Sequence, residues 1–273
     1  MIKRLIVNAD DFGRSASINE AVVAAHRSGI LTTGSLMVNE SAAEEAAKLA
    51  RNNPALGVGL HLSLICGAAA LSSGDIPGLL SSGNRFSENP AVAGTRYFFG
   101  RDLYPQLERE ISAQFARFRA TGLPLDHVNG HLHFHLHPTV LKILLRNADT
   151  WGIKTIRLTS DPLPLNLRIA GGRWFYRLSH ALIFSLLSRR AAPLLAQRQI
   201  KHTDRVFGLL QNALAGEDYV LRLLDCLPDG ISELFSHPST DQFRNEFEAL
   251  ISPRVRQAVT ARNIELIRYQ DLL

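Results

Sequence analysis

The chain has 273 residues, of which 46% are hydrophobic, 20% charged and 7% aromatic. This is an ordinary globular composition, which excludes long disordered, collagen-like and coiled-coil chains. Two cysteines, Cys66 and Cys226, are too few for a disulfide framework and indicate a reducing compartment. The sequence contains neither a signal-peptide pattern nor an uncharged apolar run of about 20 residues that would span a membrane. We therefore expect a cytoplasmic protein.

Apolar runs alternate with helical periodicity through the first half of the chain. Four runs have the length and composition of buried strands, at 5–9, 35–38, 56–62 and 125–129. Four helical patterns accompany them, at 18–28, 42–52, 103–121 and 138–151. Residues 67–97 are rich in Gly, Ser and Pro and predict a long loop.

The second half continues in the same way. Strand-like runs lie at 155–158, 231–235 and 265–268, and helical patterns lie at 219–226 and 241–262. Alternating strands and helices predict a mainly parallel sheet. Six or seven strands favour an irregular β/α barrel over a doubly wound sheet. We expect residues 1–273 to form a single domain of this α/β class.

The net charge of +5 is concentrated in one segment. Residues 162–203, here called the basic segment, contain no Asp or Glu. They contain seven basic residues: Arg168, Arg173, Arg177, Arg189, Arg190, Arg198 and Lys201. The rest of the chain therefore has a net charge of 5 − 7 = −2. A nucleic-acid-binding protein would more often spread its basic residues over a broad face, so we expect no nucleic-acid partner.

The basic segment also contains many aromatic and aliphatic residues, among them Trp174, Phe175 and Phe184. We expect an amphipathic helical insert here. Two interpretations stay open. The helix packs on the barrel and turns a solvated basic face outward, or it contacts the surface of an anionic membrane.

Acidic and imidazole side chains follow four of the predicted strands. Asp10 and Asp11 follow the first strand, and His61 lies at the end of the third. His131 and His237 follow the runs at 125–129 and 231–235. Functional groups of β/α barrels gather at the carboxyl ends of the strands, so these side chains should meet. Adjacent buried carboxylates are costly unless one binds a metal or a proton, although one of them could instead cap the next helix.

Five of the ten histidines lie in one segment, at His127, His131, His133, His135 and His137. Alternate positions of an extended segment point the same way, and imidazole suits zinc and other first-row ions. Together with the double Asp, the cluster predicts a metal site. Spacing alone does not decide which histidine is a ligand, and a loop of histidines bonded to backbone is the alternative. The other histidines in helical or basic context, which include His26 and His180, are expected outside the site.

Four motifs occur in order along the chain: Asp10 to Gly13 after its strand, Gly59 to Leu62, His127 to Pro138, and Ser236 to Pro238. Together they resemble the YdjC-like (ChbG-type) carbohydrate deacetylase family. Within that family, residues 29–32, 35–38 and 121–129 are similar to the hopanoid-biosynthesis-associated HpnK branch.

This resemblance implies an irregular β/α barrel, related to polysaccharide deacetylases, that hydrolyses the N-acetyl group of an amino sugar. Asp11, His61 and His131 match the ligands of one divalent ion, magnesium or zinc. Asp10 matches the catalytic base, and His237 matches a general acid.

The sequence departs from many relatives in one place. They have Asp-Ser where this chain has Asn129-Gly130, so a carboxylate near the site is missing here.

The branch resemblance also implies a substrate, an N-acetylglucosaminyl hopanoid glycolipid, which the enzyme would meet at the inner face of the membrane. A soluble chitooligosaccharide is the alternative substrate. A non-catalytic lipid-binding accessory protein and a metal-dependent phosphodiesterase are the alternative functions. The oligomeric state stays open.

Overall fold

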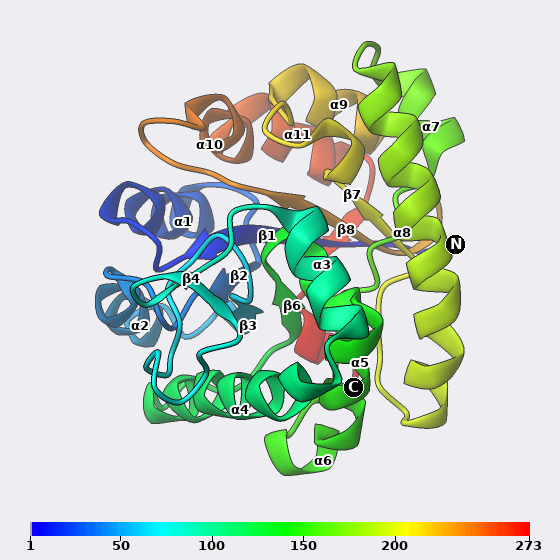
Figure 1. The fold of residues 1–273 in the computed structure, drawn as a ribbon. Coiled ribbons are helices and arrows are strands. Elements are labelled where there is room, and N and C mark those ends of the chain that lie inside the picture. The colour runs from blue at the N-terminus through cyan, green and yellow to red at the C-terminus, as the bar shows by residue number, and fades with distance from the viewer. Residues whose placement is uncertain (1) are drawn as a thin grey trace.

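The computed structural model describes residues 2–273 and contains one curved parallel sheet (Figure 1). Its strands are β1 (Lys3–Phe12), β2 (Thr33–Leu36), β3 (Gly57–Leu62), β6 (Val128–Gly130), β7 (Arg205–Phe207), β8 (Gly230–Ser236) and β9 (Ile264–Leu266). The order is β6-β3-β2-β1-β8-β7, and β9 pairs with the first residues of β1. This arrangement confirms the predicted α/β class and its irregular, barrel-like sheet.

Helices surround the strands, with α1 and α2 on one side and α8 on the opposite side (Figure 1). The helices that cover the sheet are α1 (Ala16–Ser28), α2 (Ala43–Arg51), α4 (Tyr104–Ala120), α5 (Pro138–Arg146), α8 (Trp174–Gln197), α9 (Glu217–Asp225), α10 (Arg244–Ile251) and α11 (Pro253–Ala261). Their apolar sides join one buried cluster that extends along the chain from Leu5 to Ile264. Burial of this apolar surface is the main force that holds the helices on the strands.

The predicted strand at 155–158 is not a strand of the sheet. Ile156 makes an isolated bridge to Val128, and Ser160 accepts a backbone hydrogen bond of 3.0 Å from Val206 of β7. The segment thus pairs with one edge strand at its beginning and with the other at its end, so no continuous ladder forms. It crosses the gap between β6 and β7.

Short elements account for the other differences. The predicted loop at 67–97 contains the hairpin β4 (Leu80–Ser82) and β5 (Arg85–Phe86) and the helix α3 (Pro90–Phe99). Strand β7 was not predicted, because its three residues are too few to show an alternating pattern.

Two predicted helices are each broken in two. The pattern at 138–151 divides at Asn147 into α5 and α6 (Ala148–Trp151). The pattern at 241–262 divides into α10 and α11 at Ser252 and Pro253. Proline lacks an amide hydrogen and clashes with the preceding turn, so it begins the second helix rather than continuing the first.

The basic segment forms α7 (Leu163–Ile169) and α8. Its arginines do not all face solvent: Arg177 is buried and donates to Ala170 O and Asn166 Oδ1, both at 2.7 Å. Large apolar side chains instead lie outward, among them Phe175, which is 88% exposed. Within residues 2–273, no helix combines the length and apolar composition needed to cross a membrane.

Candidate active site

Strand β1 delivers two consecutive carboxylates to one cavity. Successive residues of a regular strand point to opposite faces, yet Asp10 and Asp11 both line this cavity. The pairing of β1 with β2 is irregular between Ala9 and Phe12, and Asp11 has a φ of 62°. Asp tolerates this left-handed conformation better than most residues do. The local irregularity therefore turns the second carboxylate toward the first.

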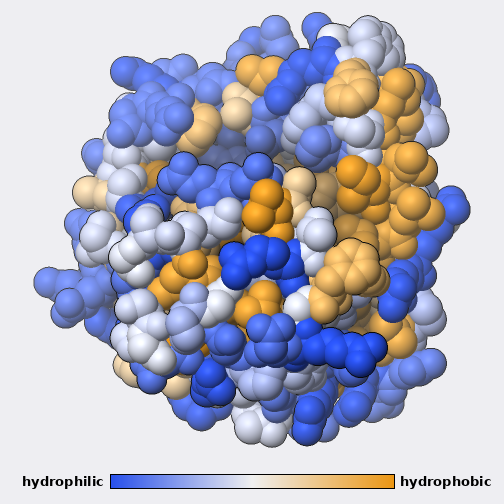
Figure 2. Space-filling model, viewed as in Figure 1, coloured by the Kyte–Doolittle hydropathy of each residue, from blue (hydrophilic) through white to orange (hydrophobic). Residues whose placement is uncertain are grey.

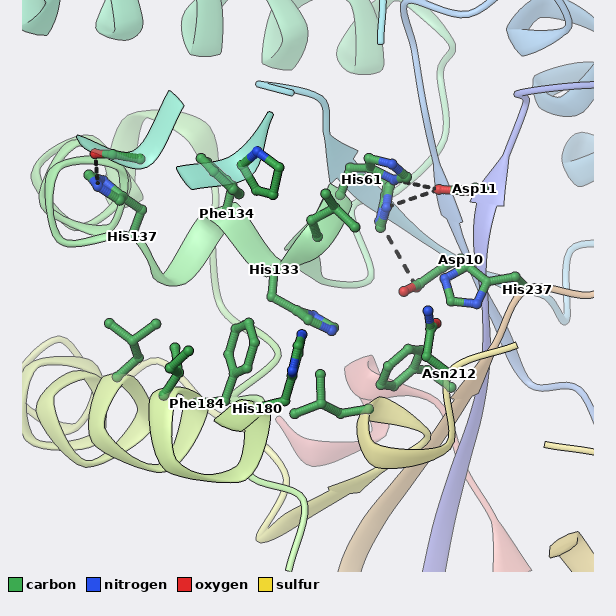
Figure 3. Close-up of a pocket in the computed structure, with 18 of the residues that line it drawn as sticks. Asp10, Asp11, His61, His133, Phe134, His137, His180, Phe184, Asn212 and His237 are labelled. Carbon is green, nitrogen blue, oxygen red and sulfur yellow. Dashed lines mark hydrogen bonds and ion pairs between the residues drawn. The ribbon is translucent and has the colours of Figure 1, made fainter. Parts of the chain in front are cut away.

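Asp11, His61 and His131 form a group that could hold a metal ion, and Figure 3 shows Asp11 and His61 side by side. Asp11 Oδ1 lies 3.0 Å from His131 Nδ1 and 3.3 Å from His61 Nε2. The three ligand atoms lie within 4.8 Å of one another, and all three residues are buried. One carboxylate and two imidazoles are a donor set that zinc and other first-row ions accept. The residues therefore fit a divalent ion.

Neighbouring side chains orient this group. Asn129 Oδ1 lies 2.7 Å from His61 Nδ1, so the ring proton is placed on Nδ1 and the lone pair of Nε2 faces Asp11. Arg14 donates to Asp11 Oδ2 at 2.7 Å. Burial alone would raise the pKa of Asp11, but the His131 imidazole beside the carboxylate holds it well below its ordinary value.

Asp10 is held by a buried arginine that the sequence analysis did not identify. Arg157 donates to both carboxylate oxygens, Nη1 to Oδ2 at 2.7 Å and Nη2 to Oδ1 at 2.9 Å. Asn8 and Asn129 also donate to Oδ1, at 2.7 and 3.1 Å. Burial favours the neutral acid, but the guanidinium holds the pKa of Asp10 well below its usual range. Asp10 is therefore an oriented carboxylate at neutral pH.

Arg157 is shared with a second buried carboxylate. Its Nε and Nη2 donate to Glu233 of β8, at distances between 2.6 and 3.1 Å, and the Tyr269 hydroxyl also donates to Glu233. A sequence signal for this network did exist. Arg157 and Glu233 are charged residues inside apolar runs, which is costly unless each has a buried partner.

His237 enters the same cavity from the residue after β8 (Figure 3). Its Nδ1 lies 3.8 Å from Glu246 Oε2, and its backbone amide donates to the same oxygen at 2.6 Å. Burial works against its charged form, but Glu246 and the two aspartates raise the pKa of His237 to about 9. The imidazole is therefore protonated at neutral pH and can donate a proton.

The histidine segment does not stay extended, so its predicted alternation is wrong. Residues His131–Leu136 form the short 3-10 helix η2, in which Leu132 and His133 have left-handed backbone. As a result His131 reaches Asp11, while His133 enters the cavity at a different place.

The remaining histidines of the segment bond elsewhere. His127 lies between Asp126 and Ser35, at 2.8 and 2.9 Å. His135 Nε2 lies 2.9 Å from Arg157 O, and His137 Nε2 lies 3.1 Å from Gly94 O. His127, His135 and His137 therefore form hydrogen bonds with neighbouring protein groups and are not part of the group that could hold a metal.

The cavity has a volume of about 630 Å³ and two chemically different ends. Asp10, Asp11, His61, His131 and His237 lie at the polar end. Phe134 and Phe184 lie on the opposite side, here called the apolar end (Figure 3), and Leu132, Ile183 and Leu187 also line the cavity. His180 of α8, which was expected outside the site, also lines the cavity (Figure 3). The sequence signal that could have found it is its place on the same helical face as Phe184.

Two bacterial proteins with assigned names are similar to this chain over part of its length. The chain is 42% identical to a carbohydrate deacetylase of Brevibacillus brevis over 150 residues, which are 55% of this chain and 57% of that relative. The chain thus spans less than two thirds of that relative's length. It is 34% identical to a chitooligosaccharide deacetylase of Salmonella paratyphi B over 180 residues, or 63% of this chain and 68% of that one.

The solved structure of an Enterococcus faecalis protein, named for cellobiose-phosphate cleavage, has the same fold. It superposes with a TM-score of 0.77 at 22% identity and covers 100% of this chain and 99% of its own. The family model of YdjC-like proteins matches residues 4–261. The chain therefore belongs to the YdjC-like protein family.

Proposed function

We propose that this protein is a metal-dependent N-deacetylase that removes the acetyl group of an amino sugar. The observation that supports this most directly is the group of Asp11, His61 and His131 beside the oriented carboxylate of Asp10, in one cavity. An amide is a poor electrophile, so its hydrolysis needs an activated water and a proton donor for the amine. The cavity contains side chains suited to each task. Residues 1–273 act as a single domain in this proposal.

Asp11, His61 and His131 would hold one divalent ion, magnesium or zinc. Such an ion supplies Lewis acidity toward the acyl oxygen and the attacking water. Asn129 and Arg14 keep its ligands oriented, through His61 and Asp11 respectively.

Asp10 is the proton acceptor in this scheme. Its Oδ1 accepts three hydrogen bonds, whereas Oδ2 accepts one, from Arg157. Oδ1 is therefore saturated, whereas Oδ2 has a single protein donor and can still accept the proton of the attacking water. His237 gives its proton to the departing amine as the C–N bond breaks. The products are acetate and the free amino sugar.

Acetate release tests this function. Purified protein with added zinc or magnesium is incubated with N-acetylated sugars and glycolipids, and acetate is measured. We expect acetate from at least one N-acetylglucosamine compound, and none after chelation of the metal. Absence of acetate from every compound would contradict the deacetylase proposal.

Metal content tests the proposed ligands. We expect wild-type protein to retain one divalent ion per chain after dialysis, and His131→Ala to lose it because one of three ligands is gone. His137→Ala, in the same segment but bonded to Gly94 O, should keep the ion. Equal metal content in wild type and His131→Ala would show that the ion is held elsewhere.

For the substrate, we propose an N-acetylglucosaminyl hopanoid glycolipid, in line with the similarity to the HpnK branch. The apolar end of the cavity supports this substrate. Ile183, Phe184 and Leu187 offer no hydrogen-bonding group to the hydroxyls of a sugar, whereas they suit the apolar part of a glycolipid. A soluble chitooligosaccharide is the second candidate because the Salmonella relative has that name.

We further propose that the protein works in the cytoplasm, in peripheral contact with the inner face of the membrane. Figure 2 shows apolar side chains gathered along α8. Trp174, Phe175 and Leu182 are 56%, 88% and 63% exposed. The basic segment supplies positive charge beside them and no acidic residue. Exposed apolar and basic residues together are typical of surfaces that meet anionic lipid.

Liposome flotation tests this contact. Each basic residue near an anionic surface contributes about 1 kcal/mol, and salt screens it. We expect wild-type protein to float with anionic vesicles at low salt, and the Arg173→Gln, Arg189→Gln, Arg190→Gln triple variant to float much less. Arg177 is left intact because it is buried.

The matched control replaces three exposed arginines of α2 and α11 with Gln: Arg51, Arg254 and Arg256. This variant should float like wild type. Equal flotation of both triple variants, or no flotation of wild type at any salt, would contradict membrane contact.

A further inference from the structure

Two consecutive residues of η2 have an unusual backbone. Leu132 has φ 47° and ψ 28°, and His133 has φ 58° and ψ 25°. Leu rarely adopts this left-handed conformation, whereas His, like Asn and Asp, adopts it more often than most residues do. Strained backbone of this kind persists where the surroundings enforce it, and it is concentrated at functional sites. The strained backbone therefore indicates a functional role for the side chain that it positions, that of His133.

The strained turn places the His133 side chain inside the cavity. Figure 3 shows its imidazole pointing into the space bordered by Asp10, Asn212 and His180. His133 is 9% exposed, and it has no part in the group formed by Asp11, His61 and His131. It lies between that group and the apolar side chains of α8 that line the cavity, here called the apolar wall.

Its surroundings fix the ring and leave one nitrogen free. The ring packs edge-on against Phe184 and Phe235, with centroid distances of 5.1 and 5.2 Å. Nδ1 lies 3.4 Å from Thr159 Oγ1. Nε2 receives and donates no hydrogen bond within the described residues 2–273. Nε2 is open to the cavity rather than sealed within the protein, so a bound ligand can reach it.

We propose that His133 is a specificity-determining residue, whose Nε2 forms a hydrogen bond with a ring hydroxyl of the amino sugar. This inference rests on the proposed deacetylase function. With the acetamide at the metal-binding group, the sugar ring occupies the middle of the cavity, where His133 is. The remainder of the substrate then extends toward the apolar wall. His133 neither transfers a proton nor binds the metal in this role.

Steady-state kinetics with a soluble N-acetylated sugar, together with metal analysis, test the proposal. His133→Phe keeps a ring between Phe184 and Phe235 but removes the hydrogen bond. We expect KM to rise about tenfold, the effect of one lost hydrogen bond of ordinary strength, while kcat and metal content stay near wild type. Asn tolerates left-handed backbone and keeps a polar amide, so His133→Asn should have a KM between those of wild type and His133→Phe.

The matched control is His26→Phe on α1, outside the cavity, which should leave KM unchanged. An unchanged KM in His133→Phe, or a loss of its metal, would overturn the role of His133. If wild type releases no acetate from any N-acetyl sugar, the deacetylase proposal itself fails. If wild type is active and only the KM prediction fails, the fault lies with His133 alone.

Discussion

Asp10→Asn is expected to lower kcat by two orders of magnitude or more while the protein keeps its metal. Removal of a general base typically costs about 10²–10⁴-fold, because the water proton then has no acceptor. The amide of Asn cannot take that proton, although it is similar in size to the carboxylate. Asp10 lies outside the group of Asp11, His61 and His131, so metal content should not change. The measurement is acetate release beside metal analysis.

The control for this experiment is a second buried aspartate. Asp161 does not line the cavity, so its carboxylate takes no part in the proposed chemistry. Asp161→Asn should therefore retain activity within a few-fold. Near-normal turnover in Asp10→Asn would show that another group accepts the proton. Loss of metal from Asp10→Asn would show that Asp10 is itself a ligand.

The strand ends were the most predictable part of the site. Asp10, Asp11, His61 and His237 each follow or end an apolar run, and parallel strands bring such positions to one edge. This topological rule does not depend on exact strand bounds. It therefore predicted the meeting of these side chains although several strands begin or end elsewhere than expected.

The histidine segment could not be resolved from the sequence because its conformation is set by tertiary contacts. Extended backbone would have turned His131, His133 and His135 to one side. The left-handed turn at Leu132 and His133 separates them instead. Left-handed backbone at Leu is rare, so no propensity argument predicts the turn at Leu132.

The neighbours of Asp10 were missed for a different reason. Arg157 and Glu233 come from segments 76 residues apart, and their meeting depends on residues 155–160 crossing between the edge strands. A predicted strand at 155–158 does not show that this segment crosses between the two edge strands. The sequence did show that Arg157 and Glu233 each lie inside an apolar run, where a charge needs a partner.

Arg157→Met is expected to destabilise the fold strongly as well as to abolish activity. Arg157 is fully buried and donates to both Asp10 and Glu233. Removing the arginine would leave the two buried carboxylates without the guanidinium that they share, and breaking a buried pair in this way typically costs about 3–5 kcal/mol. Arg157→Lys keeps the charge, but a lysine cannot reproduce the planar fork, so we expect an intermediate loss.

Chemical denaturation measures the effect as a change in the free energy of unfolding. The matched control is Arg244→Met, whose partner Glu248 lies at 2.8 Å in an exposed pair of the kind worth about 0–1 kcal/mol. A loss in Arg157→Met no larger than in Arg244→Met would mean that water, rather than Arg157, compensates the two carboxylates. The double variant Arg157→Met, Glu233→Gln removes one of the two buried anions. If it is more stable than Arg157→Met alone, the loss of unfolding free energy comes from the uncompensated buried charge. The same double variant would still lack turnover, since Asp10 would have lost the guanidinium that orients its carboxylate.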